Sequence, residues 1–129
     1  MDSHPIKLMT PYERIAQRYQ MYPQAQSFEW YVEHHLKNGF VFSRPDFFVM
    51  GRPVCRYAPA SLITEPTYLF DPDQCDCWYV FAMAGDLTHV WDILPWELEY
   101  VAWERILDSC RELRFYKSDR IQNLCMSRN

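Results

Sequence analysis

Residues 71–86 read DPDQCDCWYVFAMAGD and place three carboxylates and a Cys-x-Cys in front of the most apolar run of the chain. Within this run both sets of alternate side chains are apolar, which is typical of a strand inside a sheet that is covered on both faces. The alternation predicts one face with Cys77, Tyr79, Phe81 and Met83 and another with Trp78, Val80, Ala82 and Ala84. We therefore expect residues 78–84 to form the central strand, with Gly85 ending it.

Two helices are expected before this strand. Thr10 can cap the first helix, a proline follows at the first helical position, and Glu13 can close a capping box. Ser27 can cap the second helix, and Gly39 is typical of its C-terminal end. The N-terminal third of the chain is therefore predicted to be helical.

Shorter elements are expected around the central strand. FVFS (40–43) and FFVMG (47–51) are apolar runs separated by a turn, which predicts two antiparallel strands. Asp86 can cap a short helix over residues 87–94. LEYVAWERI (98–106) and ELRFYK (112–117) predict an antiparallel hairpin, and Ser118 begins a short last helix.

Residues 51–76 contain four prolines, which are Pro53, Pro59, Pro66 and Pro72. They predict a long irregular connection with one short strand at residues 68–70. Together the elements predict one α+β domain over residues 1–129. Its core is a mostly antiparallel, twisted sheet of about five strands, with two N-terminal helices and a short helix after the central strand.

The Cys-x-Cys is not expected to bind a metal ion. A calcium loop starting at Asp71 would need glycine and glutamate where Asp76 and Ala82 stand. A structural zinc site uses paired Cys-x-x-Cys knuckles, and Cys75 and Cys77 supply neither that spacing nor a second half. A disulfide between two such close residues would be strained. We predict that the aspartates solvate a turn and that Cys77 enters the core.

Two further features are weaker candidates. Gly85 and Asp86 join a strand to a helix start, where free backbone N–H groups can bind an anion or a cofactor phosphate, although Asp86 can itself fill that place. His34 and His35 lie side by side on a predicted helix and His89 on another, without a partner that would mark any of them as a general base. We expect one packed and one exposed imidazole in the pair.

The composition excludes several classes of protein. The formal net charge of −4 disfavours nucleic acid as a partner. A stripe of basic residues could still bind a phosphate backbone, but we expect it to be a solvent-exposed face; it consists of Arg111, Arg114, Lys117 and Arg120. No apolar run approaches the about 20 residues of a membrane span. The N-terminus does not have the pattern of a signal peptide. The five cysteines cannot all be paired in disulfides within one chain, so we expect a cytoplasmic protein with free thiols.

The order of the predicted elements resembles that of the acetyltransferase-type acyl-CoA fold: two helices, antiparallel strands, a central strand that leads into a helix, then a further strand and hairpin. The resemblance implies a degenerate acetyltransferase-like fold as the alternative architecture and acyl-CoA-dependent acyl transfer as the alternative activity. That fold holds a pyrophosphate with an arginine or glutamine followed by spaced glycines, and this motif does not occur between Met83 and Thr88.

The aromatic content points to a binding function. Tryptophan and tyrosine suit interfaces as well as cores, and this chain has five tryptophans, which are Trp30, Trp78, Trp91, Trp96 and Trp103. We therefore expect a non-catalytic interaction protein without a cofactor. Its predicted partner is another protein or a second copy of itself, contacted through an aromatic-rich surface.

Overall fold

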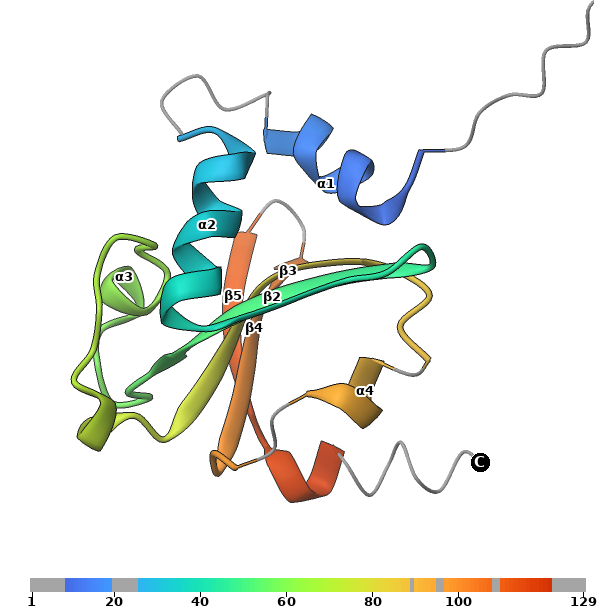
Figure 1. The fold of residues 1–129 in the computed structure, drawn as a ribbon. Coiled ribbons are helices and arrows are strands. Elements are labelled where there is room, and N and C mark those ends of the chain that lie inside the picture. Colours follow the sequence, from blue (N-terminus) through green and yellow to red (C-terminus); the bar gives the residue numbers. More distant parts are fainter. Residues whose placement is uncertain (1–8, 20–25, 89, 95–96, 108–109, 122–129) are drawn as a thin grey trace, which may run out of the picture.

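The computed structural model describes residues 9–19, 26–88, 90–94, 97–107 and 110–121 (Figure 1). The helices are α1 (Pro11–Tyr19), α2 (Phe28–Asn38), α3 (Ala60–Ile63) and α4 (Val90–Ile93), and residues Pro72–Gln74 form a 3-10 turn. The strands are β1 (Phe40–Ser43), β2 (Phe47–Val54), β3 (Cys77–Gly85), β4 (Tyr100–Leu107) and β5 (Cys110–Lys117).

The strands form one five-stranded sheet in the order β1-β2-β3-β4-β5, so β3 is central, as the sequence predicts. Neighbouring strands are antiparallel except for β3 and β4, which are parallel. Parallel neighbours need a crossover connection, and the segment with α4 provides it. The predicted α+β class and the mostly antiparallel sheet are therefore confirmed.

The predicted starts of the two N-terminal helices are also confirmed, whereas the helix expected over residues 87–94 is shorter and begins at Val90. The hydroxyl of Thr10 accepts a hydrogen bond from the Glu13 amide and donates one to the Glu13 carboxylate, each over 3.1 Å. Ser27 Oγ accepts from the amide of Trp30 over 3.2 Å. Residues 118–121 begin a helix, and the remainder of the predicted last helix lies outside the described residues.

The prediction of a long irregular connection over residues 51–76 is wrong, because part of this segment belongs to β2 and part to α3. Strand β2 continues through Pro53 to Val54, and β1 ends opposite Gly51, so at Pro53 the strand β2 has a neighbour on one side only. Proline lacks a backbone N–H, and it is tolerated at such an edge because no neighbouring strand needs that hydrogen-bond donor. Residues 68–70 form no strand, whereas residues 60–63 form the helix α3.

The predicted faces of β3 are correct only up to Phe81. Gly51 pairs with Val80 and Met50 with Ala82, so Phe81 is the extra residue of a β-bulge. The inserted residue reverses the alternation that follows it. As a result Met83 packs with the core beneath α4, and Ala82 packs with the core beneath α1 and α2, opposite to the prediction.

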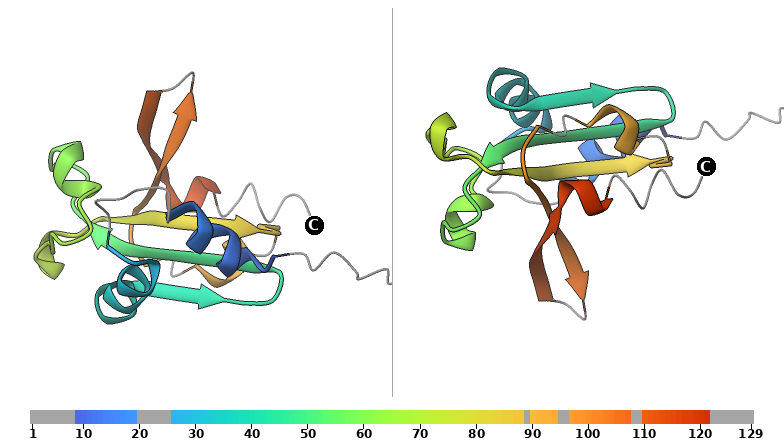
Figure 2. Two further views of the ribbon diagram at one scale, coloured as in Figure 1. Left: turned by 90° about the horizontal axis from the view of Figure 1, so that it is seen from above. Right: turned by 90° about the horizontal axis from the view of Figure 1, so that it is seen from below.

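Apolar cores lie on both faces of β3. One contains Val49, Val80 and Val101 with Val90 of α4. The other lies under α1 and α2, and Phe81 connects it to a smaller cluster beside α3. Figure 2 shows that the β4–β5 hairpin lies at a steep angle to the other three strands and projects beyond β3.

Candidate functional site

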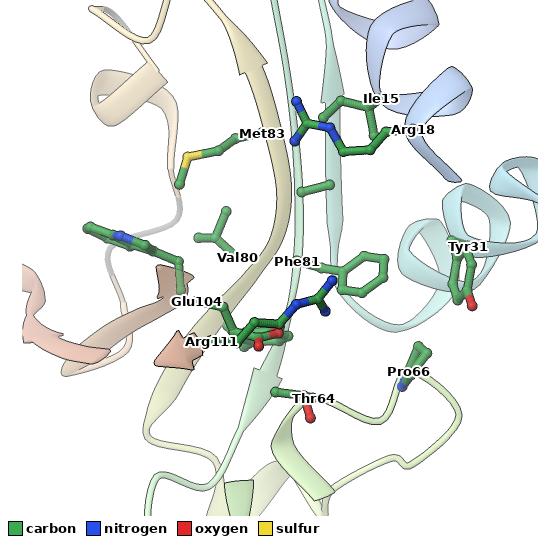
Figure 3. A pocket seen from close by; sticks show the side chains of 13 residues that line it. Ile15, Arg18, Tyr31, Thr64, Pro66, Val80, Phe81, Met83, Glu104 and Arg111 are labelled. Atoms are coloured by element: carbon green, nitrogen blue, oxygen red, sulfur yellow. The ribbon is translucent and has the colours of Figure 1, made fainter. Parts of the chain in front are cut away.

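A cleft opens where β3 and β4 diverge. Within the described residues, their ladder consists of three pairs, the last of which is Tyr79 with Ala102, although β3 continues to Gly85. The cleft has a volume of about 650 Å³ and runs along β3 beyond Tyr79 (Figure 3). Its lining comes from α1, α2, the segment after α3, β3, β4 and β5: Ile15, Arg18, Tyr31, Thr64, Pro66, Tyr79, Val80, Phe81, Ala82, Met83, Trp103, Glu104 and Arg111.

Phe81 is the aromatic centre of the cleft. The β-bulge that it forms lies directly after the last pair of the β3–β4 ladder. Its ring stacks on His35 with a centroid distance of 5.0 Å and an interplanar angle of 11°, and it contacts Tyr31 at 5.3 Å. Because bulges re-aim side chains, this one places a large ring on the face of β3 that packs against α2.

A buried polar pair supports Phe81 from below. Arg52 is 1% exposed and His35 is 0% exposed, and Nη1 of Arg52 lies 3.0 Å from Nε2 of His35. Nη2 of Arg52 donates to the carbonyl of Ile63 over 2.6 Å. The guanidinium also lies over the rings of Tyr79 and Phe81, at 5.0 and 5.6 Å from their centroids. These contacts compensate the desolvation of a buried charge.

The protonation of His35 is set by this environment. Burial lowers its pKa from 6.5 to about 4, and the nearby Arg52 charge acts in the same direction, against the hydrogen bond to the Tyr31 carbonyl. The imidazole is therefore neutral at pH 7. It serves as a fixed acceptor for Arg52 and as a flat surface beneath Phe81.

Tyr79 and Glu104 connect the two diverging strands. The hydroxyl of Tyr79 donates to Oε1 of Glu104 over 2.7 Å, and Tyr79 itself is 1% exposed. Of the described residues that line the cleft, Glu104 is the one with a carboxylate, and this hydrogen bond directs it toward β3. The contact stabilises the angle at which β4 leaves β3.

Two arginines line the cleft together with Glu104. Arg18 comes from the last turn of α1 and Arg111 from β5, and both are exposed. In Figure 3 their side chains lie on opposite sides of Phe81. Arg111 and Glu104 are diagonal neighbours on β5 and β4, so this carboxylate lies close to one of the two arginines.

The predicted anion site at Gly85 and Asp86 is not part of this cleft. Gly85 has a φ of 97°, and a Cβ atom there would lie 2.3 Å from the carbonyl oxygen of Asp46. Oδ1 of Asp86 accepts hydrogen bonds from the amide and the hydroxyl of Thr88, so this carboxylate occupies the turn where an anion would bind. The packing against Asp46 accounts for the glycine.

The cysteines lie where the sequence predicts a core and a turn. Cys77 is fully buried, and burial raises the pKa of its thiol. Cys75 is half-buried and its pKa is also raised by burial. The preceding aspartates form the hydrogen bonds of the turn. Oδ1 of Asp71 accepts a hydrogen bond from the Asp73 amide, and the carboxylate of Asp76 accepts hydrogen bonds from the backbone and side chain of Arg56. Among the described residues, no three His, Cys, Asp or Glu side chains could together hold a metal ion.

The remaining predicted residues are dispersed. His34 is half-buried and stacks on Trp30 at 5.0 Å, so the expectation of an exposed imidazole is wrong. Trp78 packs edge-on against Phe40, and Trp103 stacks on Tyr116 at the cleft. His89, Trp96 and the side chain of Trp91 lie outside the described part of the chain.

Comparisons with protein-family models, curated proteins and solved structures find no match to this chain. In the described part of the chain, no helix has the length and apolar composition that crossing a membrane requires. The cleft therefore has to be interpreted from its own chemistry.

Proposed function

We propose that the protein is a binding module that accepts an extended segment of a partner protein in the cleft between β3 and β4. The end of the β3–β4 ladder at Tyr79 is the single observation that carries the proposal. Beyond this point one edge of a central strand borders a cleft, and an extended peptide can add to such an edge through main-chain hydrogen bonds. The apolar and aromatic lining supplies pockets for alternate side chains of the peptide.

The aromatic interface expected from the sequence has a specific location in this proposal. Tyr31, Phe81 and Trp103 come from three different elements and line the same cleft. Aromatic side chains of this kind contribute much of the binding energy at protein interfaces. A second copy of the chain remains the other occupant that the proposal allows, and its test is the mass of the protein in solution.

Acyl-CoA binding is the second candidate function, and one observation favours it. The cleft lies between β3 and β4, which are parallel neighbours that separate beyond Tyr79. The turn after β3 does not favour it, because Asp86 fills the place of a phosphate. A rise in melting temperature with acetyl-CoA would move this candidate to first place.

Selection from a random peptide library on the immobilised full-length protein tests the proposal. Thr64→Trp places a large ring at the rim of the cleft, whereas Ser61→Trp adds the same ring on the exposed part of α3 outside the cleft. We expect selected peptides to bind the wild type and Ser61→Trp and to lose binding to Thr64→Trp. Equal binding to both variants, or no selected peptide, contradicts the proposal.

A further inference from the structure

We infer that the protein associates with a second copy of itself through the outer edge of β5. This strand is the last of the sheet, and among the described strands only β4 pairs with it. Its other edge therefore presents main-chain N–H and C=O groups to which a further strand can add. The β4–β5 hairpin projects beyond β3, so a second strand can approach this edge without meeting the first three strands (Figure 2).

The order of charges along β5 is self-complementary. Glu112 and Arg114 lie on either side of Leu113 and share one face of the strand. When two copies of β5 pair antiparallel around a two-fold axis at Leu113, Glu112 of each copy lies directly opposite Arg114 of the other. Opposite charges in such positions stabilise a pair of strands. A two-fold interface requires a surface that is complementary to itself, and this stretch of β5 meets the requirement.

The same charges disfavour the neighbouring registers. With the axis at Glu112, two carboxylates would lie directly opposite each other, and with the axis at Arg114 two guanidinium groups would do so. Like charges in these positions destabilise strand pairing. Charged side chains usually protect an edge strand from pairing. On β5 they disfavour the two adjacent registers and favour the one centred on Leu113.

The ion pair that exists within each chain is compatible with this pairing. Nη2 of Arg114 lies 3.0 Å from Oε2 of Glu112, and both side chains are accessible to solvent. Two such pairs in antiparallel orientation form a ring of four alternating charges, and networks contribute more than isolated surface pairs. Arg105 lies opposite Glu112 on β4, which is the side away from the second copy. The ring therefore forms without displacing a cation.

The other face of β5 adds apolar area to the contact. Phe115 is 38% exposed, and Leu113 is half-buried on the same face. Across the axis Leu113 meets its own copy, and Phe115 is its diagonal neighbour, within reach of a large ring. Burial of this apolar surface adds to the main-chain hydrogen bonds. Because the contact is one strand wide, we expect a weak, concentration-dependent dimer.

Sedimentation equilibrium of the full-length protein over a concentration series tests the inference. We expect the wild type to shift from monomer to dimer. Glu112→Arg and Arg114→Glu each place like charges opposite each other twice in the dimer, and each should weaken association about tenfold or more. A mixture of these two variants should associate, because both cross-copy pairs are then of opposite charge. Glu33→Arg, at an exposed position of α2, is the control and should associate like the wild type.

The mixture separates pairing between copies from the ion pair within one chain. The loss of an intrachain pair is not repaired by mixing, so association of the mixture supports the inference, and its failure to associate overturns it. A wild type that is monomeric at every concentration also overturns it, as do single variants that associate unchanged. Circular dichroism shows whether each variant is folded.

The double variant Glu112→Arg/Arg114→Glu covers the case in which a single variant does not fold. It retains a pair of opposite charges within the chain and across the axis, so it should associate with itself but not with labelled wild type. Equal association with both overturns the inference.

A cleft variant distinguishes the edge of β5 from the cleft as the place where a second copy binds. Thr64→Trp fills the rim of the cleft and should leave self-association unchanged. If Thr64→Trp abolishes self-association, the second copy lies in the cleft and the inference is wrong. Peptide binding in the cleft is measured separately, so a monomeric protein that binds selected peptides contradicts only the inference.

Discussion

The Nε2 atom of His35 lies 3.0 Å from Nη1 of Arg52, and both side chains are buried beneath the cleft. Because a guanidinium has no acceptor, Nε2 must accept this hydrogen bond and Nδ1 must carry the proton. Nδ1 then donates to the carbonyl of Tyr31 over 2.7 Å. The pair therefore joins α2 to β2 and fixes the tautomer, the charge and the orientation of the ring on which Phe81 stacks.

Removal of Arg52 is expected to destabilise the fold. Arg52→Met leaves Nε2 of His35 and the carbonyl of Ile63 without their donors, and unsatisfied buried groups should lower the free energy of unfolding by about 3 kcal/mol. Urea denaturation measures the change. Arg44→Met in the exposed β1–β2 turn is the control, with an expected change within about 0.5 kcal/mol. Equal stability of the two variants would mean that the buried pair is not formed.

The stability of the protein should fall in weakly acidic solution. The folded-state pKa of His35 is lowered to about 4 from an ordinary 6.5, so between these values the unfolded chain binds more protons than the folded one. The free energy of unfolding therefore rises with pH across this window. It should fall by about 3 kcal/mol as the pH is lowered from 6.5 to 4. The lowered pKa of His34 acts in the same direction.

His35→Gln separates this effect from other acid-induced changes. Its side-chain oxygen can accept from Arg52 but does not titrate. Unfolding by urea at several pH values should give a clearly smaller slope between pH 4 and 6.5 for His35→Gln than for the wild type. An unchanged slope would show that His35 is not the group responsible.

Gly85 is expected to be intolerant of any side chain. Its φ of 97° is unfavourable for other residues, and a Cβ atom would approach the Asp46 carbonyl oxygen to 2.3 Å. Gly85→Ala should lower the free energy of unfolding by about 2 kcal/mol or more. Gly85→Asn tests the cause, since asparagine tolerates positive φ better but also has a Cβ atom. Recovery of wild-type stability in thermal melts of Gly85→Asn would exclude the close contact.

The two neighbouring cysteines should respond differently to substitution. Cys77→Ser places a hydroxyl in a fully buried apolar position and should destabilise by about 1–3 kcal/mol. Cys75→Ser changes a half-buried residue and should remain within about 0.5 kcal/mol. Thermal melts with added zinc provide the second readout. A zinc-dependent rise in melting temperature that either substitution abolishes would show that the thiols are ligands.

The sequence predicted the elements that depend on local chemistry. The caps at Thr10 and Ser27 follow from hydrogen bonds across three residues, and the central position of β3 follows from its apolar faces. Asp86 fills the turn after β3, which the sequence also allowed. These features need no knowledge of distant contacts.

The cleft could not be predicted, because each of its parts depends on pairing between distant segments. Arg52 pairs with Tyr79 in the β2–β3 ladder, and its burial is possible because His35 and Ile63 accept its hydrogen bonds. In the sequence, a charged residue before a proline favours the start of a loop. The bulge at Phe81 is a single inserted residue that no alternation pattern reveals. An arginine inside an otherwise apolar run, FFVMGRPV, was the one available signal for the buried pair.

Hydrogen exchange along β3 tests the central claim that the cleft beyond Tyr79 is the binding site. Backbone amides of residues 80–83 are compared in the protein alone and with a peptide selected on it. We predict that the peptide slows exchange at residues 80–83, where a new strand would add to the edge, and leaves residues 77–79 unchanged because β4 already pairs with them. Protection confined to another surface, with unchanged exchange at residues 80–83, would contradict the account.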